Sequence, residues 1–253
     1  GRILSFTAEP SGPEDTDAYR YIEDGALLIE DGMIAASGTF DEVSPQAQGV
    51  EMVDHRPHLL MAGFIDTHIH FPQVQVIASW GAQLLDWLNQ YTFPTEAKFS
   101  DMEYAREIAK IFLAETLKSG TTTAMVYATV FSDSVEAFFE ESERLNTRMI
   151  CGKVMMDRNA PENILDTAQS AYDDSKALIE KWHGRGRATY AITPRFSPTS
   201  TPDQLSALGA LWGEHPDVLM QTHLSEQVDE IAWVQELFPD SSSGWACCAW
   251  CIF

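Results

Sequence analysis

The chain has 253 residues, of which 45% are apolar, and this allows one large domain or a domain with a small attachment around a packed core. Its 16 lysines and arginines against 38 acidic residues give a formal charge of −22, and such a surface repels nucleic acids and anionic membranes. Because no run of about 18 apolar residues occurs and no signal peptide is visible, we expect neither a membrane span nor export, and a small substrate that is not a polyanion.

The first 60 residues are expected to form strands of a small β domain. Residues 25–38 have the pattern of a hairpin, because Asp31 and Gly32 can supply the positive backbone angles of a tight turn between two apolar runs. A further apolar run at residues 58–66 leads directly to His68 and His70.

After residue 61 the pattern changes to strands that alternate with helices. Continuous apolar runs at 121–128, 148–156, 188–193 and 217–223 are typical of parallel strands buried on both faces.

Helices are predicted in the gaps between these strands, from capping boxes, an N-terminal proline and apolar positions at helical spacing. The residues that carry these signals, in chain order, are Ser100 with Glu103 and a stop near Gly120; Val135, Phe138, Phe139 and Ser142; Pro161; Thr201, Pro202 and Gln204; and Val228, Ile231 and Ala232.

Five strand-and-helix units in a row predict an α/β fold: a partial (β/α)₈ TIM-type barrel with about five of eight units, whose sites lie at the carboxyl ends of its strands. We expect the β-domain strands over residues 1–60, the partial barrel over 61–240 and an anomalous tail over 241–253. A doubly wound open sheet is the alternative, although no glycine-rich dinucleotide loop follows any strand.

Two histidines at the end of the first barrel strand suggest a metal site. Residues i and i+2 of a strand point to the same face, so His68 and His70 should point together into the barrel. Buried imidazoles need partners, and neutral imidazole is a preferred zinc ligand. His223, at the end of the fifth strand, is the candidate third ligand. The alternative is a chance pair of surface histidines.

Glu226 follows His223 by three residues and is the candidate for acid–base catalysis. A carboxylate near a metal can take a proton from the activated water and pass it to a leaving group. The alternative is that Glu226 begins the next helix, where an anion stabilises the N-terminus by about 0.3–1 kcal/mol.

Three further residues are candidates for binding a flat heterocycle. Arg195 and Phe196 lie just past the fourth strand and offer forked donors and a stacking face, and Gln73 offers an amide. The alternatives are a loop arginine, a core phenylalanine and a glutamine that faces water.

The remaining cysteines and histidines are assigned structural or surface roles. The four cysteines do not form a disulfide framework, which favours a reducing, cytoplasmic location. Asp66 is expected to accept from nearby backbone donors and Cys151 to lie in the core. The histidines expected at the surface are His55, His58, His183 and His215.

These motifs resemble the amidohydrolase superfamily and, within it, the guanine deaminase family. The segment GFIDTHIHFPQ (63–73) resembles the first-strand motif, and the match runs from about residue 25 to 240. The later signatures follow in the same order: DWLNQYTFPTE (86–96), MDRNAPE (156–162), TPRFSP (193–198) and THLSE (222–226). The two-histidine motif is shared by the whole superfamily, whereas its combination with YTFPTE and TPRFSP is much narrower.

The resemblance implies hydrolytic deamination of guanine, in which a zinc-activated water attacks purine C2 and ammonia leaves to give xanthine. It implies one zinc ion, bound by His68, His70 and His223, with Glu226 as proton shuttle and with Gln73, Arg195 and Phe196 holding guanine. Binuclear relatives need a lysine on the fourth strand, and residues 188–196 contain none. A homodimer is also implied. The rivals are an aminohydrolase or chlorohydrolase of another heterocycle and a non-catalytic fragment.

The chain departs from the family pattern toward its end. The family completes its site with a histidine on the sixth strand and an aspartate on the eighth, but no histidine follows His223. Residues 241–253 are rich in tryptophan and cysteine, and we interpret them as out of frame or artificial. The alternative is a small metal or redox element at Cys247, Cys248 and Cys251. We therefore expect a truncated chain that is poorly soluble, binds zinc weakly and deaminates guanine little.

Overall fold

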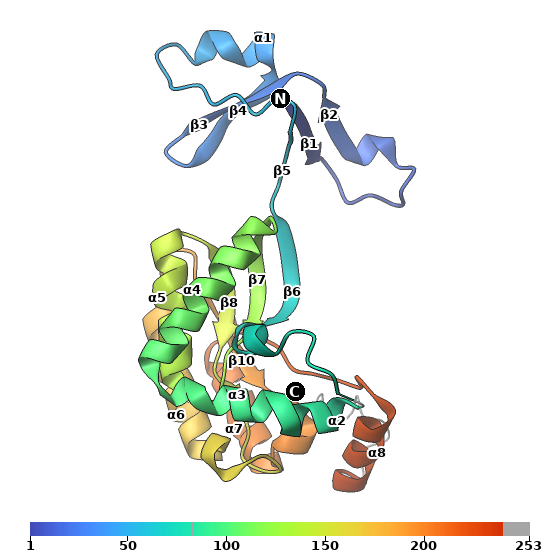
Figure 1. The fold of residues 1–253 in the computed structure, drawn as a ribbon, viewed down its shortest axis with the longest axis vertical. Coiled ribbons are helices and arrows are strands. Elements are labelled where there is room, and N and C mark those ends of the chain that lie inside the picture. Colours follow the sequence, from blue (N-terminus) through green and yellow to red (C-terminus); the bar gives the residue numbers. More distant parts are fainter. Residues whose placement is uncertain (82, 240–253) are drawn as a thin grey trace. The chain divides into compact units, whose positions relative to one another are not determined.

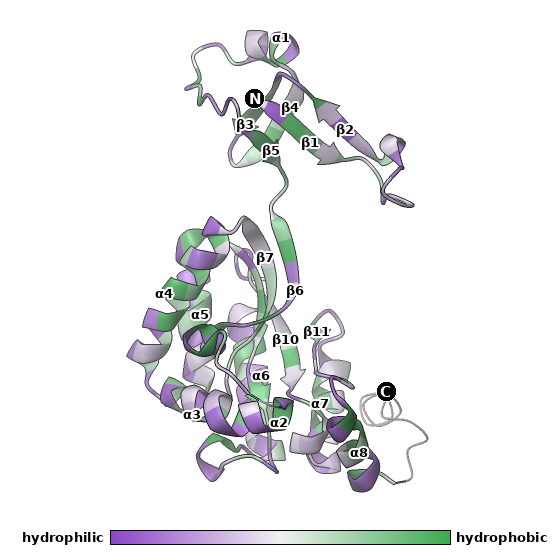
Figure 2. Cartoon of the chain, turned by 45° about the vertical axis from the view of Figure 1, so that its right-hand side comes forward, coloured by the Kyte–Doolittle hydropathy of each residue, from purple (hydrophilic) through white to green (hydrophobic). Residues whose placement is uncertain are grey.

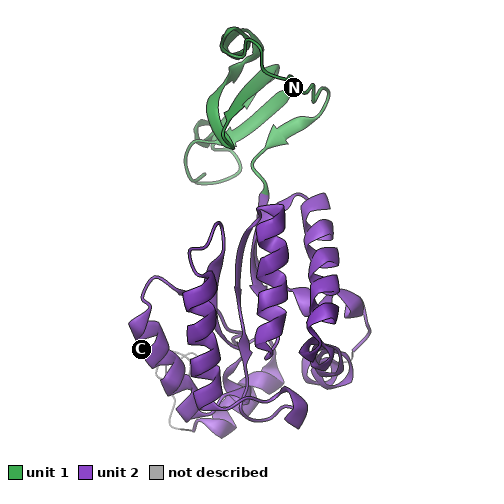
Figure 3. Ribbon diagram, turned by 90° about the vertical axis from the view of Figure 1, so that its left-hand side faces the viewer, with its two compact units in different colours: residues 1–63 green, residues 64–253 purple. Residues whose placement is uncertain are grey.

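The computed structural model describes residues 1–81 and 83–239. The chain divides into two compact units, residues 1–63 and the chain from residue 64 on, which are described separately (Figure 3). No helix within residues 1–81 and 83–239 is long and apolar enough to cross a membrane. The predicted tail, residues 241–253, lies outside the described part, and the predicted domain limits remain predictions.

The first unit consists of two small sheets. A three-stranded sheet has the order β2-β1-β5, and β3 pairs with β4 as a hairpin. The hairpin turn is the predicted one, since φ is 50° at Asp31 and 77° at Gly32. The bounds are β1 Arg2–Phe6, β2 Tyr19–Ile22, β3 Gly25–Glu30, β4 Met33–Thr39, the short helix α1 Phe40–Val43 and β5 Leu59–Met61.

The second unit contains a curled sheet of parallel strands in the order β11-β10-β8-β7-β6, with β9 paired to β10. Figure 1 labels β6, β7, β8 and β10 of this sheet, and Figure 2 labels β11. Each main strand lies beside the one before it in the chain, as in a barrel, whereas a doubly wound sheet reverses its order at a switch point. The partial-barrel prediction is confirmed and the doubly wound alternative is wrong. The strands are β6 Phe64–His70, β7 Thr121–Tyr127, β8 Arg148–Gly152, β9 Val154–Met155, β10 Thr189–Pro194 and β11 Leu219–Met220.

The long helices follow the strands and pack in chain order, α4 on α5, α5 on α6 and α6 on α7. They lie along one side of the sheet (Figure 1), and α4 and α5 mix hydrophilic with hydrophobic residues as helices with one buried face do (Figure 2). The helices are α2 Leu84–Trp87, α3 Phe93–Glu96, α4 Met102–Lys118, α5 Ser132–Leu145, α6 Ala168–Trp182, α7 Pro202–Glu214 and α8 Val228–Leu237.

One predicted helix start is wrong, at Pro161, whereas α7 begins at Pro202 with Thr201 as its N-cap, as predicted. Pro161 precedes only a 3₁₀ turn, Glu162–Ile164, and α6 begins at Ala168 because Thr167 and Ser170 cap it reciprocally. The predicted capping box at the start of α7 is half formed: Thr201 accepts the Gln204 N–H. The Gln204 side chain instead donates to Asp166 at 2.7 Å.

The cap of α4 is Asp101 and not the predicted Ser100. Its carboxylate accepts the backbone N–H groups of Glu103 and Tyr104 at 2.9 and 3.3 Å. The Ser100 hydroxyl donates to the Ala97 carbonyl of the preceding 3₁₀ turn. Because Ser and Asp are comparable N-cap residues, their order in the sequence could not decide between them.

We expect Asp101→Ala to lower the free energy of unfolding by about 1 kcal/mol, because two backbone donors lose their acceptor. Ser100→Ala is the matched control and should have a smaller effect. Urea denaturation followed by circular dichroism measures the free energy of unfolding of both variants. Equal losses in the two variants would show that Asp101 is not the dominant cap and that Ser100 contributes as much.

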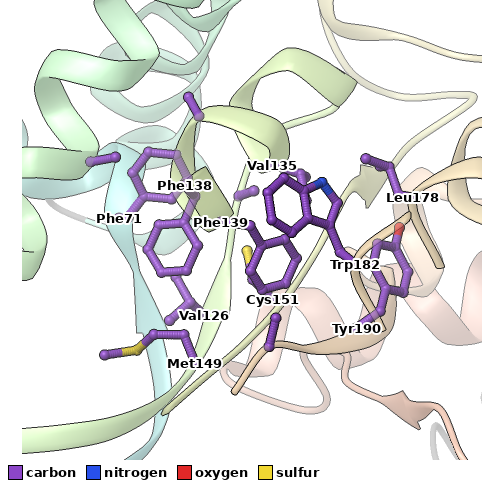
Figure 4. Packing of buried hydrophobic residues seen from close by; sticks show 14 of the residues in the cluster. Phe71, Val126, Val135, Phe138, Phe139, Met149, Cys151, Leu178, Trp182 and Tyr190 are labelled. Carbon is purple, nitrogen blue, oxygen red and sulfur yellow. The ribbon is translucent and has the colours of Figure 1, made fainter. Parts of the chain in front are cut away.

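The core lies between the sheet and the helices (Figure 4). Phe138 and Phe139 from α5 are fully buried, as the spacing predicts, and they pack on Phe71 and Trp182 with ring centroids 5.0 and 5.4 Å apart. Cys151 on β8 lies in the same cluster, which confirms its predicted core position. The packing fixes the strands whose carboxyl ends carry the site.

Candidate metal centre and active site

His68 and His70 project from the end of β6, next to an irregularity in the sheet. The pairing of β6 with β7 shifts register between Asp66 and Ile69, so the strand bulges at Thr67 and His68. The Asp66 carboxylate accepts the His68 backbone N–H at 3.0 Å, as predicted for a residue that satisfies local donors. Bulges of this kind redirect side chains at sites.

The structure brings the three predicted histidines together. His223 follows β11, yet the candidate ligand atoms of His68, His70 and His223 all lie within 4.8 Å of one another. The ring centroid of His68 is 5.4 Å from that of His70 and 4.8 Å from that of His223. Strands far apart in the sequence therefore deliver the cluster from two ends of the described sheet.

The cluster fits a divalent cation. His223 Nδ1 lies 2.8 Å from the Arg195 carbonyl oxygen and donates a hydrogen bond to it, so the lone pair on Nε2 is available to a metal ion. His223 Nε2 is 2.9 Å from His70 Nε2, somewhat less than the about 3.3 Å between two ligands of a tetrahedral zinc ion. Burial lowers the pKa of His70 well below its usual value and that of His223 to about 3, so both rings are neutral, as ligation requires.

Tyr127, the last residue of β7, supports all three imidazoles and was missed by the sequence analysis. Its ring stacks on His70 at 4.5 Å and lies 4.4 Å from His223 and 5.1 Å from His68. It is fully buried, its hydroxyl has no partner among the described residues, and burial raises its pKa. Its place at the end of the strand beside β6 was the signal that could have identified it.

All seven predicted site residues line one cavity of about 200 Å³. Its remaining wall is mostly apolar and comes from the segment that includes α2. The lining residues are His68, His70, Gln73, Leu84, Trp87, Leu88, Arg195, Phe196, His223 and Glu226. A pocket with apolar walls and a few convergent polar groups is the usual form of a small-molecule site.

Glu226 borders this cavity but does not begin a helix. The helix α8 starts at Val228, and the buried Glu230 accepts the backbone N–H groups of Ser225 and Glu226 at 3.0 and 2.7 Å. Partial burial raises the pKa of the Glu226 carboxylate. The helix-start alternative is wrong, because α8 begins two residues later, with Gln227 as its N-cap.

Arg195 lies in the loop just past β10 and is buried. Its Nη1 donates to both carboxylate oxygens of Glu96 at 3.0 and 2.8 Å, and its guanidinium lies 5.2 Å from the Phe93 ring centroid. Burial raises the pKa of Glu96, while Arg195 and Gln73 oppose that rise. Glu96 ends the DWLNQYTFPTE segment, but no role was predicted for it from the sequence.

The amidohydrolase family profile matches residues 59–243, which contain every residue of this cavity. The chain belongs to the amidohydrolase family. Members of this family typically depend on metal, which agrees with the cluster of histidines.

This amidohydrolase is similar in sequence and structure to guanine deaminases. It is 49% identical to the guanine deaminase of Escherichia coli over 95% of the chain and 55% of that relative. The E. coli structure matches with a TM-score of 0.96 at 47% identity over 59% of its length. The structure of the guanine deaminase from C. acetobutylicum, with guanine bound in the active site, matches with a TM-score of 0.85 at 28% identity. The match covers 100% of this chain and 58% of the C. acetobutylicum chain. The amidohydrolase thus spans little more than half the length of these relatives.

The other histidines of the amidohydrolase do not line the cavity. His55 and His58 are exposed, as predicted, whereas His183 and His215 are half-buried. His183 accepts the Tyr190 N–H and contacts Asp217 at 3.1 Å, so its position is structural. Cys247, Cys248 and Cys251 lie outside the described residues.

We expect Tyr127→Leu to weaken zinc binding by this amidohydrolase about tenfold, because the imidazoles lose the ring that orients them. Tyr127→Phe keeps the ring and should bind zinc nearly as the parent does. Tyr190→Leu is a control for the loss of a buried tyrosine, because Tyr190 lies in the helix-side core. Competition with a chromophoric chelator measures the affinity, and parental affinity in folded Tyr127→Leu would contradict the supporting role.

Proposed function

We propose that the enzyme to which this chain belongs hydrolyses guanine to xanthine and ammonia, with one zinc ion in each site. The observation that carries the proposal is the gathering of three imidazoles, a carboxylate and a buried arginine around one cavity. The similarity to guanine deaminases supports guanine as the heterocycle. The part that this chain lacks relative to them is expected to complete the site.

Zinc bound by His68, His70 and His223 would supply an activated water near neutral pH. These imidazoles come from β6 and from the segment after β11, and their neutral state suits ligation. The fourth strand carries no lysine, so this segment offers no bridging ligand for a second ion.

Glu226 moves the proton in this proposal. Its carboxylate faces the same cavity as the histidines, and its raised pKa suits a group that must both accept and return a proton. It takes the proton from water and gives it to the amino group that leaves C2 as ammonia.

Arg195, Phe196 and Gln73 hold the purine. The guanidinium donates hydrogen bonds to the purine oxygen, and Phe196, which packs near Trp233, contributes an apolar wall. These groups orient C2 toward the histidine cluster, so that the substrate is held in position for attack by the activated water.

The test of this function is Arg195→Ala in the chain completed to the length of its guanine deaminase relatives. We expect the guanine KM to rise by roughly 10- to 100-fold, since a charge-assisted hydrogen bond is lost, while the zinc content stays the same. Assays of the parent on cytosine, adenosine and s-triazines test the rival heterocycles. An unchanged guanine KM in Arg195→Ala, or preference for another heterocycle, would reject guanine as the substrate.

We further propose a cytoplasmic homodimer that binds no nucleic acid. The charge of −22 supports the absence of nucleic-acid binding. The lack of a disulfide framework among the four cysteines supports the cytoplasmic location, and the resemblance to the family supports the dimer. Sedimentation equilibrium of the completed chain tests the dimer.

A further inference from the structure

One buried carboxylate holds two residues of the proposed guanine pocket. Glu96, at the end of α3, accepts from Nη1 of Arg195 with both oxygens. It also accepts a side-chain hydrogen bond from Gln73. Arg195 and Gln73 line the cavity and Glu96 does not, so a residue behind the wall fixes two residues in it.

The Arg195–Glu96 ion pair is closed to solvent. The two side chains are 2% and 1% exposed, and the guanidinium also packs over the Phe93 ring. A guanidinium cannot lose its proton in a protein, and an uncompensated charge at such depth is strongly unfavourable. Glu96 therefore cancels the charge of Arg195, and this end of the cavity offers donors without net charge.

Glu96 also sets the direction of the hydrogen bonds that the cavity offers. The Gln73 amide nitrogen donates to Glu96, which leaves its carbonyl oxygen free to accept. Arg195 uses Nη1 for Glu96 and keeps its other N–H groups as donors. A donor beside an acceptor is the complement of a lactam edge, O=C–N–H, which neutral guanine carries.

We propose that Glu96 is a positioning residue that makes the pocket select an uncharged lactam heterocycle and reject anionic ones, including ionised xanthine. This inference rests on the proposed function, which names guanine as the ligand and xanthine as the product. The same preference promotes release of xanthine once it loses a proton.

Equilibrium dialysis of guanine and xanthine with the zinc-loaded chain, completed to the length of its guanine deaminase relatives, tests this. A Glu226→Gln background keeps turnover of guanine low during the measurement. The pH is chosen so that xanthine is ionised and guanine is neutral. In Glu96→Gln we expect weaker guanine binding and tighter xanthine binding, with the ratio of the two Kd values falling by roughly tenfold or more. Asp166→Asn, which removes a carboxylate from the buried pair with Lys153, is the matched control and should keep the parental ratio.

Two further variants separate charge from loss of structure. Glu96→Asp keeps the charge on a shorter side chain, so it should bind guanine less tightly and still discriminate against xanthine. The double variant Glu96→Gln/Arg195→Gln removes both charges and should show no gain in xanthine binding. Zinc affinity and circular dichroism report whether each variant is folded.

The outcomes distinguish the two proposals. A parental chain that binds no guanine would overturn the proposed function and this inference together. A parent that binds guanine without preference over ionised xanthine overturns only the role of Glu96. The same follows if folded Glu96→Gln keeps the parental ratio, or if Glu96→Asp loses the discrimination.

Discussion

Replacing His223 by alanine should weaken zinc binding by the chain more than 100-fold, since loss of a partner that merely orients a ligand already costs about 10- to 100-fold. His223 is the one histidine of the cluster contributed from beyond β10, and its Nδ1 bond to the Arg195 carbonyl fixes its orientation. With His223 removed, only two imidazoles from adjoining positions on β6 remain of the cluster found in the described residues.

Zinc affinity is measured by chelator competition and zinc content by elemental analysis. His183→Ala is the matched control, because this half-buried histidine contacts Asp217 and lies outside the cavity. Equal zinc affinity in the His223→Ala and His183→Ala variants would show that residue 223 does not ligate the metal. Absence of zinc from the parental chain would favour the non-catalytic alternative.

Replacing Glu226 by glutamine should lower guanine turnover by the completed chain about 10²- to 10⁴-fold, the range typical of a lost general acid–base. The amide keeps the size of the side chain and cannot carry the proton. Zinc content and guanine affinity should change little, because the proposed ligands and the guanidinium remain in place.

Steady-state kinetics with guanine, together with zinc analysis, check the Glu226 prediction. Glu236→Gln changes an exposed glutamate on α8 that does not line the cavity, and it should leave turnover at the parental rate. Equal turnover in the two variants would assign proton transfer to a group other than Glu226.

The sequence predicted the barrel segment well because its signals are strong and local. Long apolar runs identified β7, β8 and β10, and apolar residues that recur at helical spacing identified α5 and α8. Helix starts were less certain, since neighbouring residues such as Ser100 and Asp101 can serve as caps equally well. The strand predicted at 217–223 shrinks to Leu219–Met220 at the edge of the described sheet, where only β10 pairs with it.

The predicted site residues all reached one cavity because strand ends in a parallel sheet meet at one edge. Glu96 and Tyr127 were missed for different reasons. Glu96 follows a π-helical segment, Leu88–Thr92, whose side-chain directions no regular periodicity predicts. Tyr127 was part of a predicted strand, but an aromatic residue in a buried strand is most often a core residue. Its contact with the histidines becomes visible only when the neighbouring strands are in place.

Glu230 accepts the backbone N–H groups of Ser225 and Glu226, so the conformation of this loop does not depend on the side chain at position 226. Both bonds go to peptide N–H groups, so any side chain except proline can occupy position 226 without loosening them. Ser225 holds φ at 56°, a left-handed conformation that the same anchor restrains. The reactive group at position 226 can therefore be replaced by protein design without changing the surrounding backbone.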